Sequence, residues 1–211
     1  MKLYTYFRSS AAFRVRIALN LKGLAYDPLF VHLPKGEHRK PEYAKVDPQG
    51  LLPTLLDGGH ALSQSLAIIE YLEERHPEPP LLPRDAPGRA RVRSLSLLVA
   101  CEIHPLNNLR TLQHLKRALG QNEEQINTWY RHWIADGLAK LEADLGRAGS
   151  GRFCHGASPT MADCCLVPQI FNAKRYESDL APYPTVMRIF DACMTLEAFD
   201  RAQPSKQPDA E

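Results

Sequence analysis

The sequence lacks a long apolar run, a paired-cysteine motif and any strong excess of charge of one sign. A helix that spans a membrane needs about 18 consecutive apolar residues, so the missing run argues against a membrane partner. The chain has 26 Lys and Arg against 24 Asp and Glu, and this balance argues against a nucleic-acid partner. The first ten residues also lack the apolar stretch of a signal peptide, and we therefore expect a cytoplasmic protein.

Cysteine is absent from the first 100 residues, and the five that follow have irregular spacing without a C-x-x-C pair. That spacing predicts neither a zinc site nor a dithiol redox centre, so we expect no metal. Buried free thiols in a reducing compartment are the favoured interpretation. The five are Cys101, Cys154, Cys164, Cys165 and Cys193.

Five prolines crowd into residues 77–87 of the 211, and they predict a stiff connector between two domains. We expect a first domain at 1–80, a linker at 81–87 and an all-helical domain with a polar C-terminal tail at 88–211. Charge also segregates within the first domain, since residues 1–45 hold nine Lys and Arg against three acids. This excess suits either a solvated surface or a site for a small anionic ligand.

The first domain alternates strand and helix patterns, which predicts a mixed sheet with helices against it, an α/β arrangement. Asp57-Gly58-Gly59-His60 is a tight hairpin signal. The predicted order is strand 3–6, helix 11–22, strand 29–33, strands 54–56 and 61–63, and helix 65–76.

The second domain contains only helical patterns, so the fold class is α/β plus all-α. Pro105 is expected to kink one long helix over 89–119, and a second helix is expected over 122–145. Thr160 and Asp163 have the spacing of a capping box at the start of a third helix. A fourth helix is expected over 185–195, followed by a frayed tail over 203–211.

Three short segments of the first domain carry candidate chemistry. Ser9 and Ser10 lie between the first strand and the first helix, where a hydroxyl either caps the helix or stabilises an anion or thiolate. We predict a cis Leu52–Pro53 bond, which would present the backbone groups of Leu52 to a peptide-like ligand. Gln64-Ser65 opens a helix, where it serves as a cap or holds a carboxylate.

Taken together, these features resemble the zeta class of the glutathione transferase superfamily over residues 1–205. The resemblance rests on the segments YFRSSAAFRVRIALNLKGL, QSLAIIEYLEE, IHPLNNLR, PTMADCCLVPQ and DLAPYPT. It implies a thioredoxin-like N-terminal domain, an all-helical C-terminal domain, a homodimer and glutathione as the cofactor.

The resemblance further implies an isomerase of aromatic amino acid catabolism, which converts maleylacetoacetate to fumarylacetoacetate by thiolate addition, bond rotation and elimination. The substrate is a small dianionic cis-enedione. Ser10 matches the catalytic hydroxyl, with Ser9 beside it. The residues implied in cofactor binding are Ser9, Ser10, Ala11, His38, Leu52, Pro53, Gln64, Ser65, His104 and Asn108. Those implied in substrate binding are Arg8, Arg110 and Arg175.

The spacing of His104 and Asn108 predicts that they share one helix face, with Arg110 joining them if Pro105 kinks the helix. Many zeta-class proteins carry Ser-Ser-Cys-Ser where this chain has Ser9-Ser10-Ala11-Ala12. Cysteine chemistry at that position is therefore excluded, which puts side activities in doubt.

Three alternatives remain at this point: a maleylpyruvate isomerase, a general glutathione transferase with conjugating or peroxidase activity, and a non-catalytic binding module. The presence of Ser10, Gln64 and Ser65 argues against the binding module.

Overall fold

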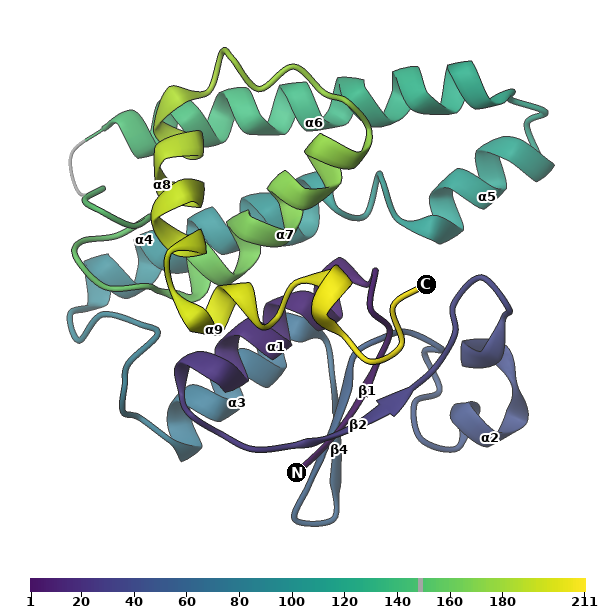
Figure 1. Ribbon diagram of the computed structural model, residues 1–211, viewed down its shortest axis with the longest axis horizontal. Helices are drawn as coiled ribbons and strands as arrows, with labels where there is room; N and C mark the ends of the chain where they lie inside the picture. Colours follow the sequence, from purple (N-terminus) through teal and green to yellow (C-terminus); the bar gives the residue numbers. More distant parts are fainter. Residues whose placement is uncertain (148–149) are drawn as a thin grey trace. The chain divides into compact units, whose positions relative to one another are not determined.

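The computed structural model describes residues 1–147 and 150–211, and these form two compact units (Figure 1). The first unit comprises Met1–Leu81 together with Met194–Glu211, and the second comprises Leu82–Cys193. Within the described ranges, no helix combines the length and the apolar composition needed to cross a membrane.

The first unit is built on a four-stranded mixed sheet in the order β2-β1-β3-β4. The central strand β1 pairs in parallel with β2 and antiparallel with β3, so that Leu3 lies opposite both Pro28 and Leu55. Pro28 lies on an edge strand, where its missing N–H breaks no ladder. The bounds are β1 Lys2–Thr5, β2 Asp27–Phe30, β3 Thr54–Asp57 and β4 His60–Ser63.

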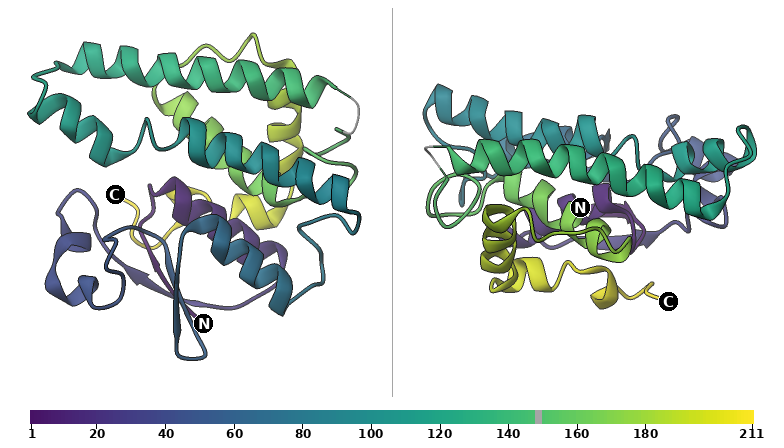
Figure 2. Two further views of the ribbon diagram at one scale, coloured as in Figure 1. Left: turned by 180° about the vertical axis from the view of Figure 1, so that it is seen from behind. Right: turned by 90° about the horizontal axis from the view of Figure 1, so that it is seen from above.

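Helices α1 (Ser10–Leu21) and α3 (Ser65–Arg75) lie side by side against the sheet (Figures 1 and 2). Their apolar faces close the core, where Leu3, Ile17 and Ile68 are fully buried. The segment between β2 and β3 carries a 3-10 turn, Glu37–Arg39, and the short helix α2, Pro41–Ala44.

The C-terminal residues 203–211 return to the first unit, so the expectation of a frayed tail is wrong. Helix α9 (Glu197–Asp200) packs against α1, and a 3-10 turn follows at Pro204–Lys206. The Asp209 carboxylate accepts a 3.0 Å hydrogen bond from the Phe7 N–H. The polar composition of these residues predicts a solvated tail, but the structure anchors them to the first unit through the backbone of Phe7.

The second unit is all-helical (Figures 1 and 2). Helix α4 packs against α7, and α5 runs beside α6. The helix bounds are α4 Ala86–Leu97, α5 Leu109–Arg117, α6 Glu123–Gly146, α7 Met161–Arg175 and α8 Pro184–Met194.

The single long helix expected over 89–119 is wrong, because the chain breaks rather than kinks at Pro105. A π-helical turn over Leu98–Ile103 follows α4, and non-helical residues separate it from α5. Proline lacks a donor, and its ring clashes with the carbonyl four residues earlier, so the helix ends here. Asn108 then caps α5, its Oδ1 accepting from the Arg110 N–H at 3.1 Å.

The predicted capping box of α7 is confirmed. The Asp163 carboxylate accepts from the Thr160 N–H at 2.7 Å, and the Thr160 side chain accepts from the Asp163 backbone in return. All five cysteines are free thiols; four are buried as expected, whereas Cys101 is exposed.

Candidate functional site

The turn between β1 and α1 places Ser9 and Ser10 at a helix N-terminus. The Ser9 hydroxyl accepts from the Ala12 N–H at 3.2 Å and serves as the N-cap of α1. Ser10 is the first helical residue and is half-buried. The structure thus assigns the cap to Ser9 and leaves Ser10 at the positive end of the helix dipole, where a thiolate is stabilised.

The Leu52–Pro53 bond is cis, as predicted, and it directly precedes β3. The Tyr43 hydroxyl lies beside it, donating to the Leu51 carbonyl at 2.5 Å and contacting the Thr54 hydroxyl at 2.9 Å. Burial raises the pKa of Tyr43 to about 12, so the hydroxyl stays protonated. Tyr43 thus braces the segment on both sides of the proline, a role that no local sequence signal indicates.

The turn before this segment also has a side-chain brace. The Asp47 carboxylate accepts from the N–H groups of Gln49 and Leu51, both at 3.1 Å. The string Asp47-Pro48-Gln49-Gly50 has a turn composition, which is a local sequence signal for this brace. Asp47, which fixes the approach to Leu52, is thus a second bracing residue that was not predicted.

Helix α3 begins at Ser65, and Gln64 precedes it with a φ of +69°, a conformation rare for residues other than glycine. The Gln64 side chain donates to the Gln49 side chain at 2.6 Å. Arg14, 2% exposed, donates to the Ser65 hydroxyl at 3.2 Å. The N–H groups of a helix N-terminus and a buried guanidinium thus occur together, a combination that suits a carboxylate.

Sequence analysis also missed Arg14. The sequence does contain a signal for this residue, since Arg14 and Arg16 interrupt an otherwise largely apolar helix pattern. A cation on the buried side of a helix is costly unless it has partners, and such a residue marks a polar site within the fold.

His38 lies in the 3-10 turn Glu37–Arg39 and is 9% exposed. Burial, helped by the neighbouring charge of Arg39, lowers the pKa of His38, so the ring is neutral near pH 7. Its Nδ1 is buried and has no hydrogen-bond partner within residues 1–147 and 150–211. An orphaned buried nitrogen of this kind fits a ligand group that completes the site.

The sheet register brings three of these segments to one edge. Tyr4 pairs with Thr54, and Thr54 pairs with Ser63. The end of β1, the start of β3 and the end of β4 are therefore neighbours. Leu52–Pro53 directly precedes β3, Gln64-Ser65 directly follows β4, and Ser9-Ser10 follows the end of β1 after three further residues.

In the second unit, the predicted shared face of His104 and Asn108 is wrong. The chain leaves the helix at His104, and Asn108 starts the next one as its cap. His104 is half-buried, and Arg110 is exposed within the first turn of α5. The break at Pro105 removes the helical spacing on which that expectation depended.

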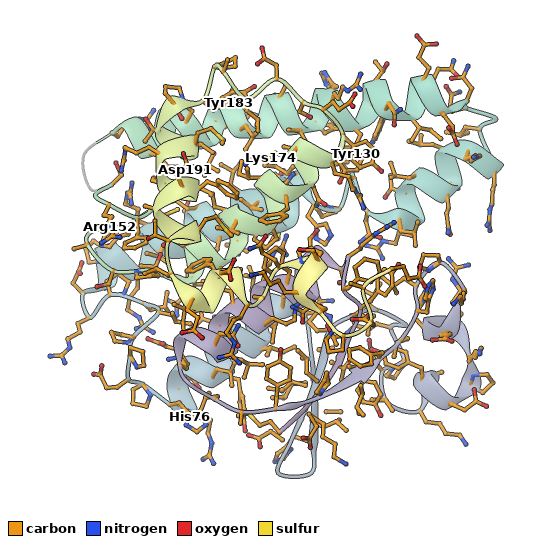
Figure 3. The ribbon with its side chains drawn as sticks, in the orientation of Figure 1. His76, Tyr130, Arg152, Lys174, Tyr183 and Asp191 are labelled. Carbon is orange, nitrogen blue, oxygen red and sulfur yellow. The ribbon has the colours of Figure 1, made fainter. Side chains whose placement is uncertain are left out.

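Arg175 ends α7 with an exposed side chain. Its guanidinium lies 4.9 Å from the Tyr176 ring centre, and the Tyr176 ring stacks on the Tyr130 ring with 3.5 Å between their centres. Figure 3 labels Tyr130 on α6. Burial raises the pKa of Tyr130 far above its ordinary value. In the first unit, Arg8 is likewise exposed, with its guanidinium 5.0 Å from the Phe7 ring. Aromatic rings thus support both cations.

Comparison with known proteins supplies the family. Residues 3–80 match the family model described as the glutathione S-transferase N-terminal domain, and residues 110–192 match that of the C-terminal domain. A Pseudomonas aeruginosa protein named maleylacetoacetate isomerase is 48% identical over 212 residues, covering 99% of this chain and 98% of the relative.

Two solved structures match along the whole chain. One is a holo structure of a maleylpyruvate isomerase, described as a bacterial zeta-class glutathione S-transferase, with a TM-score of 0.98, 49% identity and 100% coverage of both chains. The other is a maleylacetoacetate isomerase from Methylobacterium extorquens AM1 with bound malonate and glutathione, with a TM-score of 0.97, 44% identity and 100% coverage of both chains.

Proposed function

The chain belongs to the glutathione S-transferase family, and we propose that it is a glutathione-dependent cis–trans isomerase that acts on maleylacetoacetate. The observation that carries this proposal is the 48% identity, over nearly its whole length, to a protein named maleylacetoacetate isomerase. The exposed arginines favour a doubly charged substrate over the apolar electrophiles of a general transferase.

The first unit fits glutathione. Gln64 and Ser65, with Arg14 beside them, would hold the γ-glutamyl carboxylate at the N-terminus of α3. Leu52 and Pro53 would pair with the backbone of the tripeptide, and the unpartnered nitrogen of His38 suits its glycine carboxylate. Ser9, Ser10 and Ala11 would surround the sulfur, while His104 and Asn108 stay predictions from the resemblance.

Bound glutathione supplies the thiolate that adds reversibly to one alkene carbon, so that the former double bond rotates before the thiolate leaves. A free thiol has a pKa of about 8.5, so the protein must favour the ionised form near neutrality. The Ser10 hydroxyl can donate a hydrogen bond to the sulfur, and the N-terminus of α1 acts in the same direction.

The arginines bind the substrate in this proposal. A guanidinium matches a carboxylate with two parallel hydrogen bonds, so Arg8, Arg110 and Arg175 would hold the two charged ends. The bound malonate of the Methylobacterium extorquens relative, itself a dicarboxylate, supports a dianionic ligand. Fixing both ends orients the alkene relative to the thiolate and lowers the entropic part of the barrier.

Turnover of maleylacetoacetate by the purified protein, with and without glutathione, tests the proposal. We expect fumarylacetoacetate to form only when glutathione is present. Maleylpyruvate is the second candidate substrate, because the relative with a TM-score of 0.98 is named maleylpyruvate isomerase. A kcat/KM at least about tenfold higher for maleylpyruvate would reassign the substrate without changing the reaction.

We further propose a cytoplasmic homodimer. The free state of all five cysteines supports a reducing compartment, and the family resemblance supports pairing of two copies. Sedimentation equilibrium at micromolar concentration tests the assembly, and a mass of one chain would refute it.

A further inference from the structure

The turn between β1 and α1, which carries Arg8, Ser9 and Ser10, is held from two sides by groups outside it. On one side, the Phe7 N–H donates to the Asp209 carboxylate at 3.0 Å. On the other, the Arg16 guanidinium donates to the Phe7 carbonyl at 3.1 Å. Both backbone polar groups of Phe7, the residue just before Arg8-Ser9-Ser10, are therefore fixed by side chains.

Arg16 itself is 0% exposed and connects the turn to the C-terminal residues. Its Nε and Nη2 donate to the Ala202 carbonyl at 3.1 and 3.0 Å, and its Nη1 donates to the Thr5 hydroxyl at 3.1 Å. Burial lowers the pKa of Arg16 to about 10, and the charge of Asp209 opposes that shift. The buried cation and the carboxylate thus act on the same short stretch of main chain.

The end of the chain has a second attachment close to the same turn. The His32 ring and the Glu211 carboxylate lie 2.9 Å apart, and His32 packs 5.1 Å from the Tyr6 ring. The Tyr6 carbonyl in turn accepts from the Ser9 N–H at 2.9 Å. Asp209 therefore lies within a segment that is tied to the turn through Phe7 and through Tyr6.

We propose that Asp209 is a positioning residue for the reaction: through its hydrogen bond to the Phe7 N–H, it fixes the turn that places Ser10 beside the thiol and Arg8 beside the substrate. This inference rests on the proposed function. It adds to the site a residue that lies 202 positions after Phe7 in the sequence. Asp209 touches neither thiol nor substrate in this scheme. Its effect passes through the backbone of residues 7–10.

Three variants separate positioning from general stability. Asp209→Ala removes the acceptor, whereas Asp209→Asn keeps an oxygen in its place. Asp200→Ala is the matched control, because the Asp200 carboxylate accepts from Gln203 and Lys206, within the same C-terminal segment. Each variant is measured for thermal unfolding, for the pKa of the bound glutathione thiol from its thiolate absorbance, and for kcat and KM with maleylacetoacetate.

We expect Asp209→Ala to raise the pKa of the bound thiol by about 0.5 to 1 unit and to lower kcat by about tenfold. Asp209→Asn should restore both to within about threefold of the parent. Asp200→Ala should leave the thiol pKa and kcat unchanged, whatever it does to thermal stability. Should Asp209→Ala fail to fold, Asp209→Glu, which keeps the charge but displaces the carboxylate by one methylene, is read by the same criteria.

The inference is overturned if Asp209→Ala, or Asp209→Glu in its place, lowers only the unfolding temperature and leaves the thiol pKa and kcat as in Asp200→Ala. It is also overturned if Asp209→Asn behaves like Asp209→Ala, since an oxygen acceptor would then not suffice. A failure of the proposed function looks different, because the parent protein itself would show no glutathione-dependent isomerisation. The thiol pKa would still test the positioning of Ser10 in that case.

Discussion

The Arg14 guanidinium on α1 donates a 3.2 Å hydrogen bond to the hydroxyl of Ser65, the first residue of α3. Both side chains are buried. This contact joins the two helices that cover the sheet, and it places a cation at the N-terminal end of α3, the end of a helix that favours an anion. In the proposed function, the packing of the two helices and the binding of the glutathione carboxylate would therefore depend on the same pair.

Ser65→Ala should weaken glutathione binding about tenfold, because it removes a hydrogen-bonding hydroxyl and leaves an Arg14 nitrogen without this acceptor. The free energy of unfolding should fall by about 1–3 kcal/mol. Isothermal titration with glutathione and urea unfolding measure the two effects. Ser96→Ala is the matched control, since Ser96 is another buried serine, which bonds to the Val92 carbonyl in the second unit. Equal glutathione affinities in the two variants would contradict the assignment.

Ser10→Ala should raise the pKa of the bound glutathione thiol and lower kcat by about one to two decades. The reason is the loss of one charge-assisted hydrogen bond, worth about 1.5–3 kcal/mol. Ser9→Ala should instead lower helix stability by about 1 kcal/mol, because Ser9 is the N-cap of α1. Titration of the thiolate absorbance in both variants decides between the two serines. A larger pKa shift in Ser9→Ala would assign the thiol contact to Ser9.

Arg8→Ala and Arg175→Ala should each raise the KM for the dianionic substrate by about tenfold or more and leave glutathione affinity nearly intact. Replacement by lysine should restore only part of the loss, since a point charge cannot reproduce a bidentate fork. Steady-state kinetics with each ligand varied separately gives both constants. If the glutathione constant rises instead, these arginines brace the cofactor, and the substrate site must be sought near Arg110.

Tyr43→Phe should change how stability depends on alkaline pH. The pKa of Tyr43 is about 12 in the folded chain, against about 10 in an unfolded one. Since the folded state holds this proton more tightly, the contribution is complete below about pH 10 and is lost as the pH rises to about 12. The variant should be less stable by about 1–3 kcal/mol at neutral pH and should lack this part of the alkaline decline. Urea unfolding across that range measures it, and parallel stability curves would show that Tyr43 does not contribute.

Local chemistry made several features predictable. The alternation of apolar strands and helices predicted the β-α-β, β-β-α order of the first unit. Thr160 and Asp163 predicted a capping box because such a box needs only residues three apart. The candidate segments at Ser9-Ser10 and Gln64-Ser65 followed from helix starts, which are also local signals.

The wrong expectations concern interactions between residues distant in the sequence. A helical pattern over 89–119 does not show whether Pro105 bends a helix or ends it, because the outcome depends on how the flanking helices pack. The polar composition of residues 203–211 predicts a solvated tail, because the sequence does not show which partners the first unit provides. One of those partners is the Phe7 N–H. Arg14 and Arg16 likewise acquire a role only from acceptors supplied by other segments.

By itself, the sequence determined the order of the elements, the helix caps and the residue types available for thiol and carboxylate chemistry, since propensity, periodicity and capping act over a few neighbouring residues. The tertiary structure alone decided which of those residues meet. It gave the cap to Ser9 and left Ser10 at the helix end, set Arg14 against Ser65, and brought Asp209 to Phe7. A buried charge or backbone group must find a partner, and that partner is chosen by the packing of distant segments rather than by its neighbours in the chain.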